Sequence, residues 1–366
     1  MNKKKVIFII ESFILGGAER VLVDIANQLD PQKFDITVCS IFKRSVYSSY
    51  QATIENPFKP HVHYKWLVNN DFKWLYRIFN YLLVRLPAFL YKLLVGDKYD
   101  VVVAFYEGAP TSFVANAKLK HGKKLTWLHT STELSQKGKS IVALKQQEHY
   151  YSVFQKIIAV SEGVKQSFIQ FFPSLKENVL VVHNPIDSET IIKKSKESIA
   201  LLHPDCPLFV SVGRMTAVKG YDRYLRVINK LVKEGSKFEV WIIGGGERTE
   251  YEAYCKENRL ENVRFLGNQN NPYPYMKIAD WIVVPSFVEG LSTVVMEGLV
   301  LGKPILATDC PGMRELLGKS VIDNNEDSIE DGLRRILTGI QYQGQNLNNK
   351  SIQLYGIKYI GDIINA

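Results

Sequence analysis

Short apolar runs alternate with amphipathic segments along the first half of the chain. A glycine-rich turn and a helical pattern at Ala18–Leu29 follow the first of these runs. Apolar runs that are short, β-branched and separated by helical patterns are typical of a parallel sheet with crossover helices. The runs that we expect to be strands are Val6–Ile10, Phe34–Ile41, Tyr99–Phe105, Lys124–Leu128 and Lys156–Val160.

The same alternation starts again after Asn184–Asp187, with helical patterns at Tyr221–Glu234 and Thr249–Asn258. A chain of 366 residues exceeds one ordinary core, so we predict two Rossmann-like, doubly wound α/β domains that face each other, with ligands outside the carboxyl ends of the strands. We expect domains at 1–187 and 188–345, and a tail at 346–366 whose helix, Ile352–Ile364, packs back on the first domain. The expected second set of strands is Leu208–Val212, Phe238–Ile243, Val263–Leu266, Trp281–Val284 and Pro304–Ala307.

Residues 72–94 fit neither series of strands and helices. They read FKWLYRIFNYLLVRLPAFLYKLL, in which Lys73, Arg77, Arg85 and Lys92 are interleaved with aromatic and aliphatic residues. Such a helix suits a membrane interface, where long basic side chains reach the headgroups. Pro87 is expected to kink or split it. The alternative is a helical excursion that packs on its own domain.

Charge is unevenly distributed between the two halves. The first 187 residues contain 24 Lys and Arg against 15 Asp and Glu, whereas the remainder contains 22 of each. A basic half beside a neutral half indicates that one half faces an anionic surface. Nucleic acid is the rival partner, but the sequence contains no helix-turn-helix, RNP or zinc-finger pattern.

Other features of the sequence bear on where the protein works. No apolar stretch is long enough for a spanning helix, and Val6–Ile10 is too short for the apolar core of a signal peptide. The four cysteines are scattered without a CxxC pair and are expected to be reduced thiols. We therefore expect a cytoplasmic protein, held peripherally at the inner face of the cell membrane.

The most specific local pattern is a pair of glutamates, Glu289 and Glu297. The strand Trp281–Val284 ends just before them, Glu289 lies in the following loop, and a helix begins near Ser292 or Thr293. Carboxylates accept hydrogen bonds from vicinal hydroxyls of ribose or hexose, and a helix N-terminus binds phosphate. A bare pair with this spacing is more often two surface glutamates at a turn.

Three further loops follow predicted strands. Arg214 lies at the end of Leu208–Val212, and Lys219 is expected to enter the next helix; together they offer positive charge to a diphosphate. Alone, such a pair is more often solvated. Glycine-rich turns at Gly16–Glu19 and Gly244–Glu247 allow a ligand to approach the backbone closely, although neither is a GxGxxG or Walker A loop.

Two polar residues in the first half also lie at strand ends. His129 follows Lys124–Leu128, and Glu107 follows Tyr99–Phe105. A lone histidine in this position is more often structural. In a cleft between domains, His129 could contact a reacting sugar or assist a proton transfer, and Glu107 could meet an acceptor hydroxyl.

Taken in order, these motifs resemble a GT-B glycosyltransferase of family 4, over nearly the whole chain from Gly16 to Glu315. The resemblance implies a retaining enzyme that moves a hexose or N-acetylhexosamine from a nucleotide diphosphate sugar, with UDP preferred, to a glycan acceptor in capsule, exopolysaccharide or O-antigen synthesis. The acceptor is expected to be lipid-linked. Neither metal nor cofactor is expected, in agreement with the lack of a DxD motif.

The resemblance also implies roles for individual residues. Arg214 and Lys219 would bind the diphosphate, Glu297 the ribose and Glu289 the transferred sugar, with His129 near that sugar; the expected catalytic residues are His129, Arg214, Lys219 and Glu289. Glu107, Gly17 and His129 are expected to bind the acceptor. The remaining donor-binding residues are expected to be Gly16, Gly17, Gly244, Gly245, Glu247, Gly290, Leu291, Ser292 and Thr293.

Other functions on the same fold remain open from the sequence. A sugar-nucleotide epimerase or a glycogen-type synthase would share the fold, and a sugar-binding protein without activity is a further alternative. The membrane-facing features of residues 72–94 argue against a soluble polymer as acceptor. The combination of Glu289 and Glu297 with Arg214 and Lys219 argues against a purely binding role.

Overall fold

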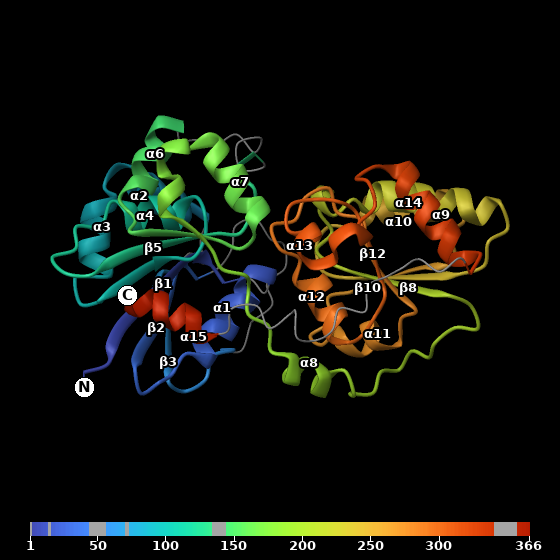
Figure 1. Cartoon of the computed structure of the whole chain (residues 1–366), viewed down its shortest axis with the longest axis horizontal. Coiled ribbons are helices and arrows are strands. Elements are labelled where there is room, and N and C mark those ends of the chain that lie inside the picture. Colours follow the sequence, from blue (N-terminus) through green and yellow to red (C-terminus); the bar gives the residue numbers. More distant parts are fainter. Residues whose placement is uncertain (1, 14–15, 44–55, 70–72, 134–143, 340–356) are drawn as a thin grey trace. The chain divides into compact units, whose positions relative to one another are not determined.

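A computed structural model describes residues 2–13, 16–43, 56–69, 73–133, 144–339 and 357–366 of the chain. The chain divides into two compact units (Figure 1). Unit 1 consists of Met1–Pro185 together with Leu354–Ala366, and unit 2 consists of Ile186–Gln353. Among the described residues, no helix is both long and apolar enough to cross a bilayer.

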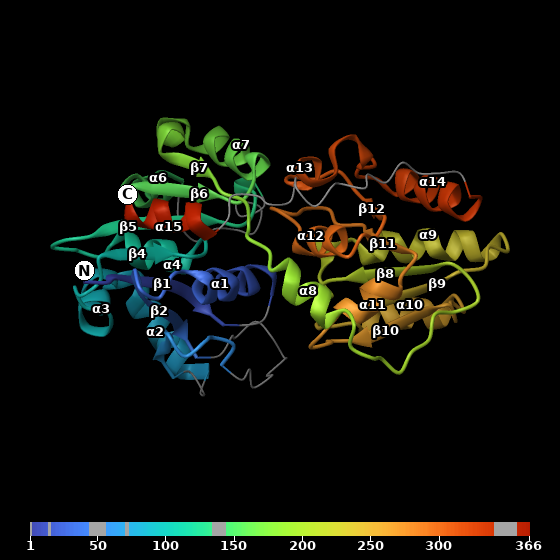
Figure 2. The same cartoon turned by 60° about the horizontal axis from the view of Figure 1, so that its bottom comes forward.

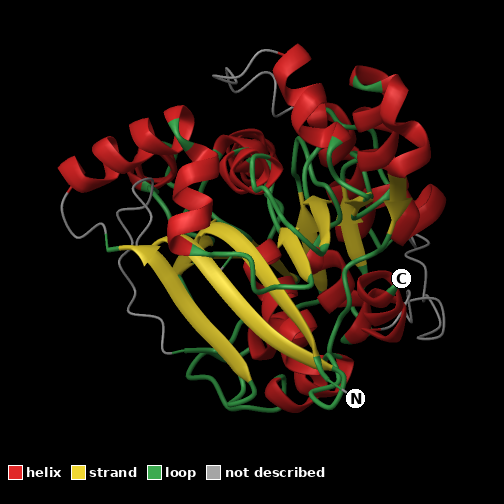
Figure 3. Ribbon diagram, turned by 90° about the vertical axis from the view of Figure 1, so that its left-hand side faces the viewer, coloured by secondary structure: helices red, strands yellow, loops and turns green. Residues whose placement is uncertain are grey.

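Unit 1 is built on a seven-stranded sheet in the order β3-β2-β1-β4-β5-β6-β7, in which every neighbouring pair is parallel. Its strands run side by side between helices (Figure 3). The order reverses between β1 and β4, and buried Val, Ile and Phe side chains of β1 form the centre of the core. The strands are β1 Lys4–Ser12, β2 Phe34–Phe42, β3 Val62–Val68, β4 Val101–Ala104, β5 Lys123–Leu128, β6 Lys156–Ala159 and β7 Val179–Val181.

Helices cover both faces of the unit 1 sheet. Crossovers are right-handed, so the reversal of strand order puts α1 and α4 on opposite faces. The last helix, α15, belongs to this unit: Lys4 Nζ donates to the Asn365 carbonyl over 2.7 Å, and Gly361 lies against Leu29 and Phe34. The helices are α1 Gly17–Gln28, α2 Lys73–Arg85, α3 Pro87–Leu94, α4 Ala109–Ala115, α6 Leu144–Ser152, α7 Glu162–Phe171 and α15 Ile357–Asn365.

Unit 2 has a five-stranded parallel sheet in the order β10-β9-β8-β11-β12. On one face, apolar residues of α9 and α14 form the core with the strands, and α8 packs with α11 and α12 (Figure 2). The strands are β8 Leu208–Val212, β9 Glu239–Ile243, β10 Val263–Gly267, β11 Trp281–Val284 and β12 Ile305–Ala307. The helices are α8 Ser188–Lys194, α9 Tyr221–Lys233, α10 Thr249–Glu257, α11 Tyr273–Ile278, α12 Thr293–Val300, α13 Met313–Leu317 and α14 Glu326–Leu337.

The predicted fold class, two doubly wound parallel sheets, is confirmed. Pro87 splits the predicted helix, since α2 ends at Arg85 and α3 begins at Pro87. The sequence analysis missed β3, whose side chains are largely half-exposed, and β7, which has only three residues. Two expected stretches lie partly outside the described residues: Phe72 before α2, and 352–356 before α15.

Candidate active site

The strand order of unit 2 reverses between β8 and β11, and the loops that leave these two strands contact each other. Glycines allow the loop after β8 to approach the loops after β11 and β9 closely, Gly220 in the first case and Gly244 in the second. Gly220 has φ +68°, and a Cβ there would lie 2.1 Å from the Pro285 carbonyl oxygen. Gly244 has φ +155°, and a Cβ there would lie 1.9 Å from the Gly213 carbonyl oxygen. Ligands of doubly wound sheets bind outside the carboxyl ends of the strands at such a reversal. The carboxyl ends of β8 and β11 are therefore the candidate site.

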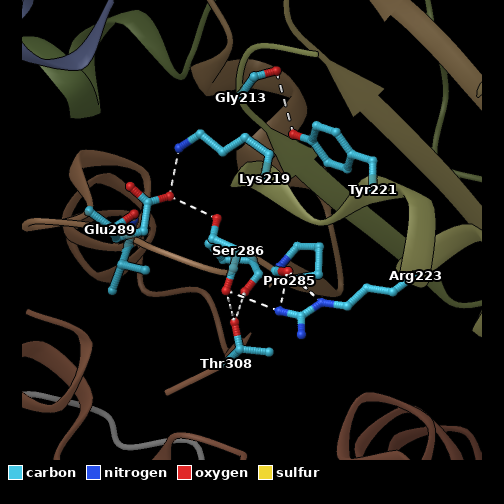
Figure 4. A network of polar contacts seen from close by, with 11 residues as sticks. Gly213, Lys219, Tyr221, Arg223, Pro285, Ser286, Glu289 and Thr308 are labelled. Atoms are coloured by element: carbon cyan, nitrogen blue, oxygen red, sulfur yellow. Dashed lines mark hydrogen bonds and ion pairs between the residues drawn. The ribbon is translucent and has the colours of Figure 1, made fainter. Parts of the chain in front are cut away.

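Lys219 and Glu289 meet at this point (Figure 4). Lys219 Nζ lies 2.6 Å from Glu289 Oε1, and the Ser286 hydroxyl donates to the same oxygen over 2.8 Å. Both charged side chains are mostly buried, with 22% and 13% of their surfaces exposed. Lys219 belongs to a short 3₁₀ turn, Ala217–Lys219, that ends at the left-handed Gly220. Our expectation that Lys219 enters the helix is therefore wrong, because α9 begins only at Tyr221.

Arg214 and Glu247 lie on loops at the same end of the sheet, and both are exposed. Arg214 follows β8, and the next residue, Met215, pairs with the Gly244–Gly246 turn through its amide, which donates to the Gly245 carbonyl over 2.8 Å. The Glu247 carboxylate accepts from the amide and hydroxyl of Thr249, which lowers its pKa. Arg214 keeps an exposed charge beside the loops, whereas Glu247 is engaged at the start of α10.

Helix α12 begins at Thr293, as expected, with Ser292 as its N-cap. The Ser292 hydroxyl accepts from the Val295 amide over 3.4 Å, and Gly290, Leu291 and Ser292 are buried. Glu297 lies one turn into the helix, is 5% exposed, and accepts from the Tyr273 hydroxyl over 3.2 Å. The two glutamates thus have different partners, Lys219 for Glu289 and Tyr273 for Glu297.

Arg223, Ser286 and Tyr273 are residues of this network that the sequence analysis missed. Arg223 is 2% exposed and donates to the Pro285 carbonyl through Nε and Nη2, over 3.1 and 2.7 Å (Figure 4). In the sequence it is one of several basic residues in an amphipathic helix, a pattern that ordinarily predicts a solvated position. Only the contact between α9 and the loop after β11 distinguishes it from its neighbours.

In unit 1, Glu107 and His129 come together at the ends of β4 and β5. Glu107 Oε1 accepts from the His129 amide over 2.7 Å, from the Thr130 amide over 2.8 Å, and from the Thr130 hydroxyl over 3.2 Å. Tyr106 stacks on the His129 ring with a centroid separation of 5.4 Å. The carboxylate therefore fixes the backbone from which His129 projects.

Each of these two residues has one buried polar atom, Glu107 Oε2 and His129 Nε2, with no hydrogen-bond partner among the described residues. Burial raises the pKa of Glu107, against the opposing effect of its hydrogen bonds from Thr130 and His129. Burial lowers the pKa of His129 to about 3, so the imidazole is neutral at pH 7. Since buried polar atoms are normally satisfied, a polar ligand is the natural partner for this pair.

Gly16 and Gly17 form the turn after β1, the strand that precedes β4 in the sheet order. Gly16 is the N-cap of α1, and its amide donates to Glu19 Oε2 over 3.1 Å. Gly17 begins the helix and is exposed. The turn therefore lies at the carboxyl end of β1, next to the strand end that carries Glu107.

Two doubly wound parallel domains are the architecture of the GT-B class of glycosyltransferases, and this fold corresponds to it. Comparison with known families agrees: residues 15–190 match the model of glycosyltransferase family 4, and residues 193–350 match that of glycosyl transferases group 1. The chain belongs to this family and is a glycosyltransferase, as the sequence predicted.

Relatives and solved structures extend the comparison. A glycosyltransferase of Haemophilus influenzae is 26% identical, with 98% of each chain covered. An N-acetylgalactosamine-N,N'-diacetylbacillosaminyl-diphospho-undecaprenol 4-alpha-N-acetylgalactosaminyltransferase of Campylobacter jejuni is 32% identical over 50% of each chain. The structure of HepE from Anabaena, in complex with UDP and glucose, covers 99% of this chain and 98% of its own, with a TM-score of 0.76 and 18% identity.

Proposed function

We propose that this glycosyltransferase moves a hexose or N-acetylhexosamine from a UDP-sugar to a lipid-linked glycan, with retention of the anomeric configuration and without a metal. The observation that carries the proposal is the 2.6 Å contact between Lys219 and Glu289, on loops that leave the two strands where the sheet order reverses. The pair provides one cation for a diphosphate and one carboxylate for sugar hydroxyls, side by side.

The donor fits the polar groups around this pair. Lys219 and the exposed Arg214 supply positive charge for the diphosphate, and the N-terminus of α12 adds backbone amides. Glu297, held by Tyr273, is proposed to accept from the ribose hydroxyls. The preference for UDP is supported by HepE, whose structure holds UDP and glucose. The setting in glycan assembly is supported by the named reaction of the Campylobacter relative.

The proposed reaction needs no protein nucleophile. The bond between the anomeric carbon and the diphosphate oxygen breaks, and the acceptor hydroxyl forms its bond to that carbon from the same face. The proton of the acceptor hydroxyl passes to the departing phosphate oxygen. Lys219, Arg214 and the α12 amides stabilise the negative charge that develops on the diphosphate, which is the largest contribution expected of such a site.

The buried pair in unit 1 is proposed to bind substrate hydroxyls. Glu107 Oε2 and His129 Nε2 are both buried at neighbouring strand ends. Neither atom has a hydrogen-bond partner among the described residues, so each can still form one with a substrate hydroxyl. A neutral imidazole exchanges hydrogen bonds with a hydroxyl without repelling a cation nearby. The glycine turn at Gly16–Gly17 adds backbone amides at the adjacent strand end.

A lipid-linked acceptor requires the enzyme to reach a membrane, and α2 and α3 have the surface for it. Trp74, Tyr81, Phe89 and Leu93 are between 58% and 66% exposed. Half of the large hydrophobic side chains that are exposed in the described part of the chain lie between residues 74 and 93. The apolar residues suit the boundary between headgroups and acyl chains.

Basic residues accompany this apolar surface. Arg77, Arg85 and Lys92 are exposed on the same helices. The Lys120 amide donates to Asp97 over 3.1 Å, which brings the basic segment 118–124 next to the end of α3. This combination fits an anionic bilayer, and we propose that the protein binds the inner membrane face through these helices.

The test is a transfer assay with the purified chain, a panel of UDP-, GDP- and dTDP-sugars, and polyprenyl diphosphate-linked glycan acceptors. We expect transfer from one UDP-sugar in the presence of EDTA, and an α-linked product from an α-linked donor by NMR. An inverted linkage or a requirement for a divalent metal would refute the corresponding part of the proposal. Conversion of the donor sugar without any acceptor would indicate an epimerase instead.

A further inference from the structure

Arg223 is a buried cation behind the Lys219–Glu289 pair. It lies in the first turn of α9, four residues after Lys219, and is 2% exposed. Its hydrogen bonds go to the Pro285, Ser286 and Asn324 carbonyls and to Asn324 Oδ1; none within the described part of the chain goes to a carboxylate. Its guanidinium also stacks over the Phe287 ring, 3.8 Å from the centroid.

A charge buried in this way is costly unless each bond has good geometry, and an apolar side chain of similar size often stabilises a core better. A role in packing alone would therefore favour an apolar residue at position 223. The geometry of the guanidinium points to a different use. Its planar fork supplies several donors in fixed directions, which are directed here at consecutive carbonyls of the loop after β11 (Figure 4).

That loop leads directly to the charged pair. The Ser286 carbonyl, which accepts from Arg223 Nη2 over 3.1 Å, also accepts from the Thr308 hydroxyl over 2.6 Å. The Ser286 hydroxyl donates to Glu289 Oε1 over 2.8 Å. Fixing the Ser286 backbone therefore fixes the hydroxyl that orients the Glu289 carboxylate.

The loop is joined to the Lys219 turn as well. The Phe287 amide donates to the Val218 carbonyl over 2.8 Å, one residue before Lys219. Asn324, which accepts from Arg223 Nη2 over 2.6 Å, donates through Nδ2 to the Phe287 carbonyl over 2.9 Å. The loop after β11 is therefore bonded both to the turn that carries Lys219 and, through Arg223, to the first turn of α9.

We propose that Arg223 is a positioning residue of the donor site: it holds the loop Pro285–Glu289 so that Glu289 meets Lys219 in the geometry that donor binding requires. This inference rests on the proposed function, because it acts through Glu289 and Lys219. Arg223 itself touches neither donor nor acceptor; its effect passes through the Ser286 backbone and hydroxyl.

The first test is the transfer rate of Arg223→Met, which keeps an apolar side chain of similar length and removes the fork. We expect Arg223→Met to lower kcat/KM for the donor by about 10²-fold, because Glu289 is then no longer held in position. Arg223→Lys keeps the charge without the fork, and we expect it to recover little of this loss. The matched control is Arg226→Met on the same helix, because Arg226 is about half exposed and pairs with Asp222 and Glu326. It should retain the parent rate.

The second test separates positioning from general stability by a double-mutant cycle with Glu289→Gln. If Arg223 acts through Glu289, then Arg223→Met should cost less than about threefold in the Glu289→Gln background, against about 10²-fold in the parent. A full 10²-fold loss in both backgrounds, or a parent rate for Arg223→Met, would overturn the inference. Should Arg223→Met fail to fold, Asn324→Ala takes its place in the cycle, with the same pattern at about tenfold in the parent.

The proposed function fails in a different way. A Glu289→Gln variant with the parent transfer rate would remove Glu289 from the donor site, whatever Arg223 does. A reduced rate for Glu289→Gln together with a parent rate for Arg223→Met would leave the proposed function standing and overturn only the inference about Arg223.

Discussion

The two units have the same sheet architecture but differ in whether the functional polar groups at their strand ends have hydrogen-bond partners. In unit 2, the loops after β8 and β11 form a satisfied network in which Lys219, Glu289, Ser286 and Arg223 have partners. In unit 1, Glu107 and His129 each keep a buried polar atom without a partner among the described residues. We infer that unit 2 is organised in advance for a charged ligand, whereas unit 1 gains its missing hydrogen bonds from a neutral hydroxyl.

The charge distribution follows the same division. Unit 2 has nearly balanced charges, and its exposed surface is crossed by ion pairs such as Arg334–Glu330 and Lys230–Glu330. The chain's positive excess lies in the first 187 residues, where α2 and α3 also expose their apolar side chains. A neutral, ordered unit suits a diffusing donor, and a basic, apolar surface suits an acceptor held in a membrane.

Removing the cation of unit 2 should have the largest effect. Lys219→Ala should lower transfer by about 10²- to 10³-fold, because the charge on the departing diphosphate loses its nearest cation. The measurement is kcat/KM for the donor, with Lys230→Ala as matched control, since Lys230 lies on α9 and pairs with Glu330 at the surface. If Lys219→Ala transfers at the parent rate, unit 2 does not bind the charged donor through Lys219, and the proposed difference between the two units fails.

Reversing charges on unit 1 should leave the donor site intact and weaken membrane binding. Changing Arg77, Arg85 and Lys92 to Glu should lower the affinity for anionic vesicles by at least about 10²-fold, at about 1 kcal/mol for each basic residue near the surface. Binding is measured by vesicle sedimentation at low and high salt. The control carries three exposed unit 2 lysines changed to Glu, Lys196, Lys233 and Lys256. Equal loss in both variants would show only an effect of net charge.

Much of this contrast could be predicted from the sequence, because it depends on local patterns. The β-branched runs indicated most strands, and Pro87 indicated the break between α2 and α3. Glu107 and His129 were recognised as polar residues at strand ends and Glu289 as a loop residue after a strand, whereas Lys219 was expected in the following helix and lies in the turn before it. What the sequence could not indicate were contacts between elements.

Arg223 is the clearest example of a contact that the sequence does not reveal. Its helical position is compatible with solvent, and it is buried beneath the loop after β11, which comes close to Gly220 just before α9. The strand β3 was missed for a related reason: most of its side chains are half-exposed or exposed, and its pairing with β2 is what makes it a strand. Such long-range contacts follow from the sheet order, which local periodicity does not encode.

Removing the Glu107 carboxylate should disturb unit 1 alone. Glu107→Leu leaves the partly buried His129 and Thr130 amides without their acceptor, at a cost of up to about 1 to 3 kcal/mol for each donor left unpaired. We expect a lower free energy of unfolding and a raised KM for the acceptor, with the affinity for UDP unchanged by calorimetry. A weakened affinity for UDP with an unchanged acceptor KM would reverse the assignment of the two units.

The smallest expected effect is a pH dependence of stability that originates in unit 1. The pKa of His129 is lowered to about 3 by burial, from about 6.5 in the unfolded chain. As the pH falls below about 6.5, the unfolded chain gains a proton that the folded chain does not, so stability is lost between pH 6.5 and 3. Between pH 7 and pH 5 this costs about 2 kcal/mol.

The check is a comparison of urea unfolding of the full chain and of His129→Gln at both pH values. Glu107, whose pKa is shifted in the opposite direction, is retained in both proteins, so its contribution cancels in the comparison. The parent should lose about 2 kcal/mol more stability than the variant on going to pH 5. An equal loss in both proteins would contradict a buried, neutral His129.

The central claim is that unit 2 binds the donor diphosphate at the Lys219–Glu289 pair. A crystal structure of the full chain with UDP bound tests it most directly. We predict that a diphosphate oxygen lies within hydrogen-bond distance of Lys219 Nζ, that the ribose hydroxyls meet Glu297, and that the loop from Pro285 remains bonded to Arg223. A diphosphate bound away from the loops after β8 and β11, with the Lys219–Glu289 contact unchanged, would contradict the claim.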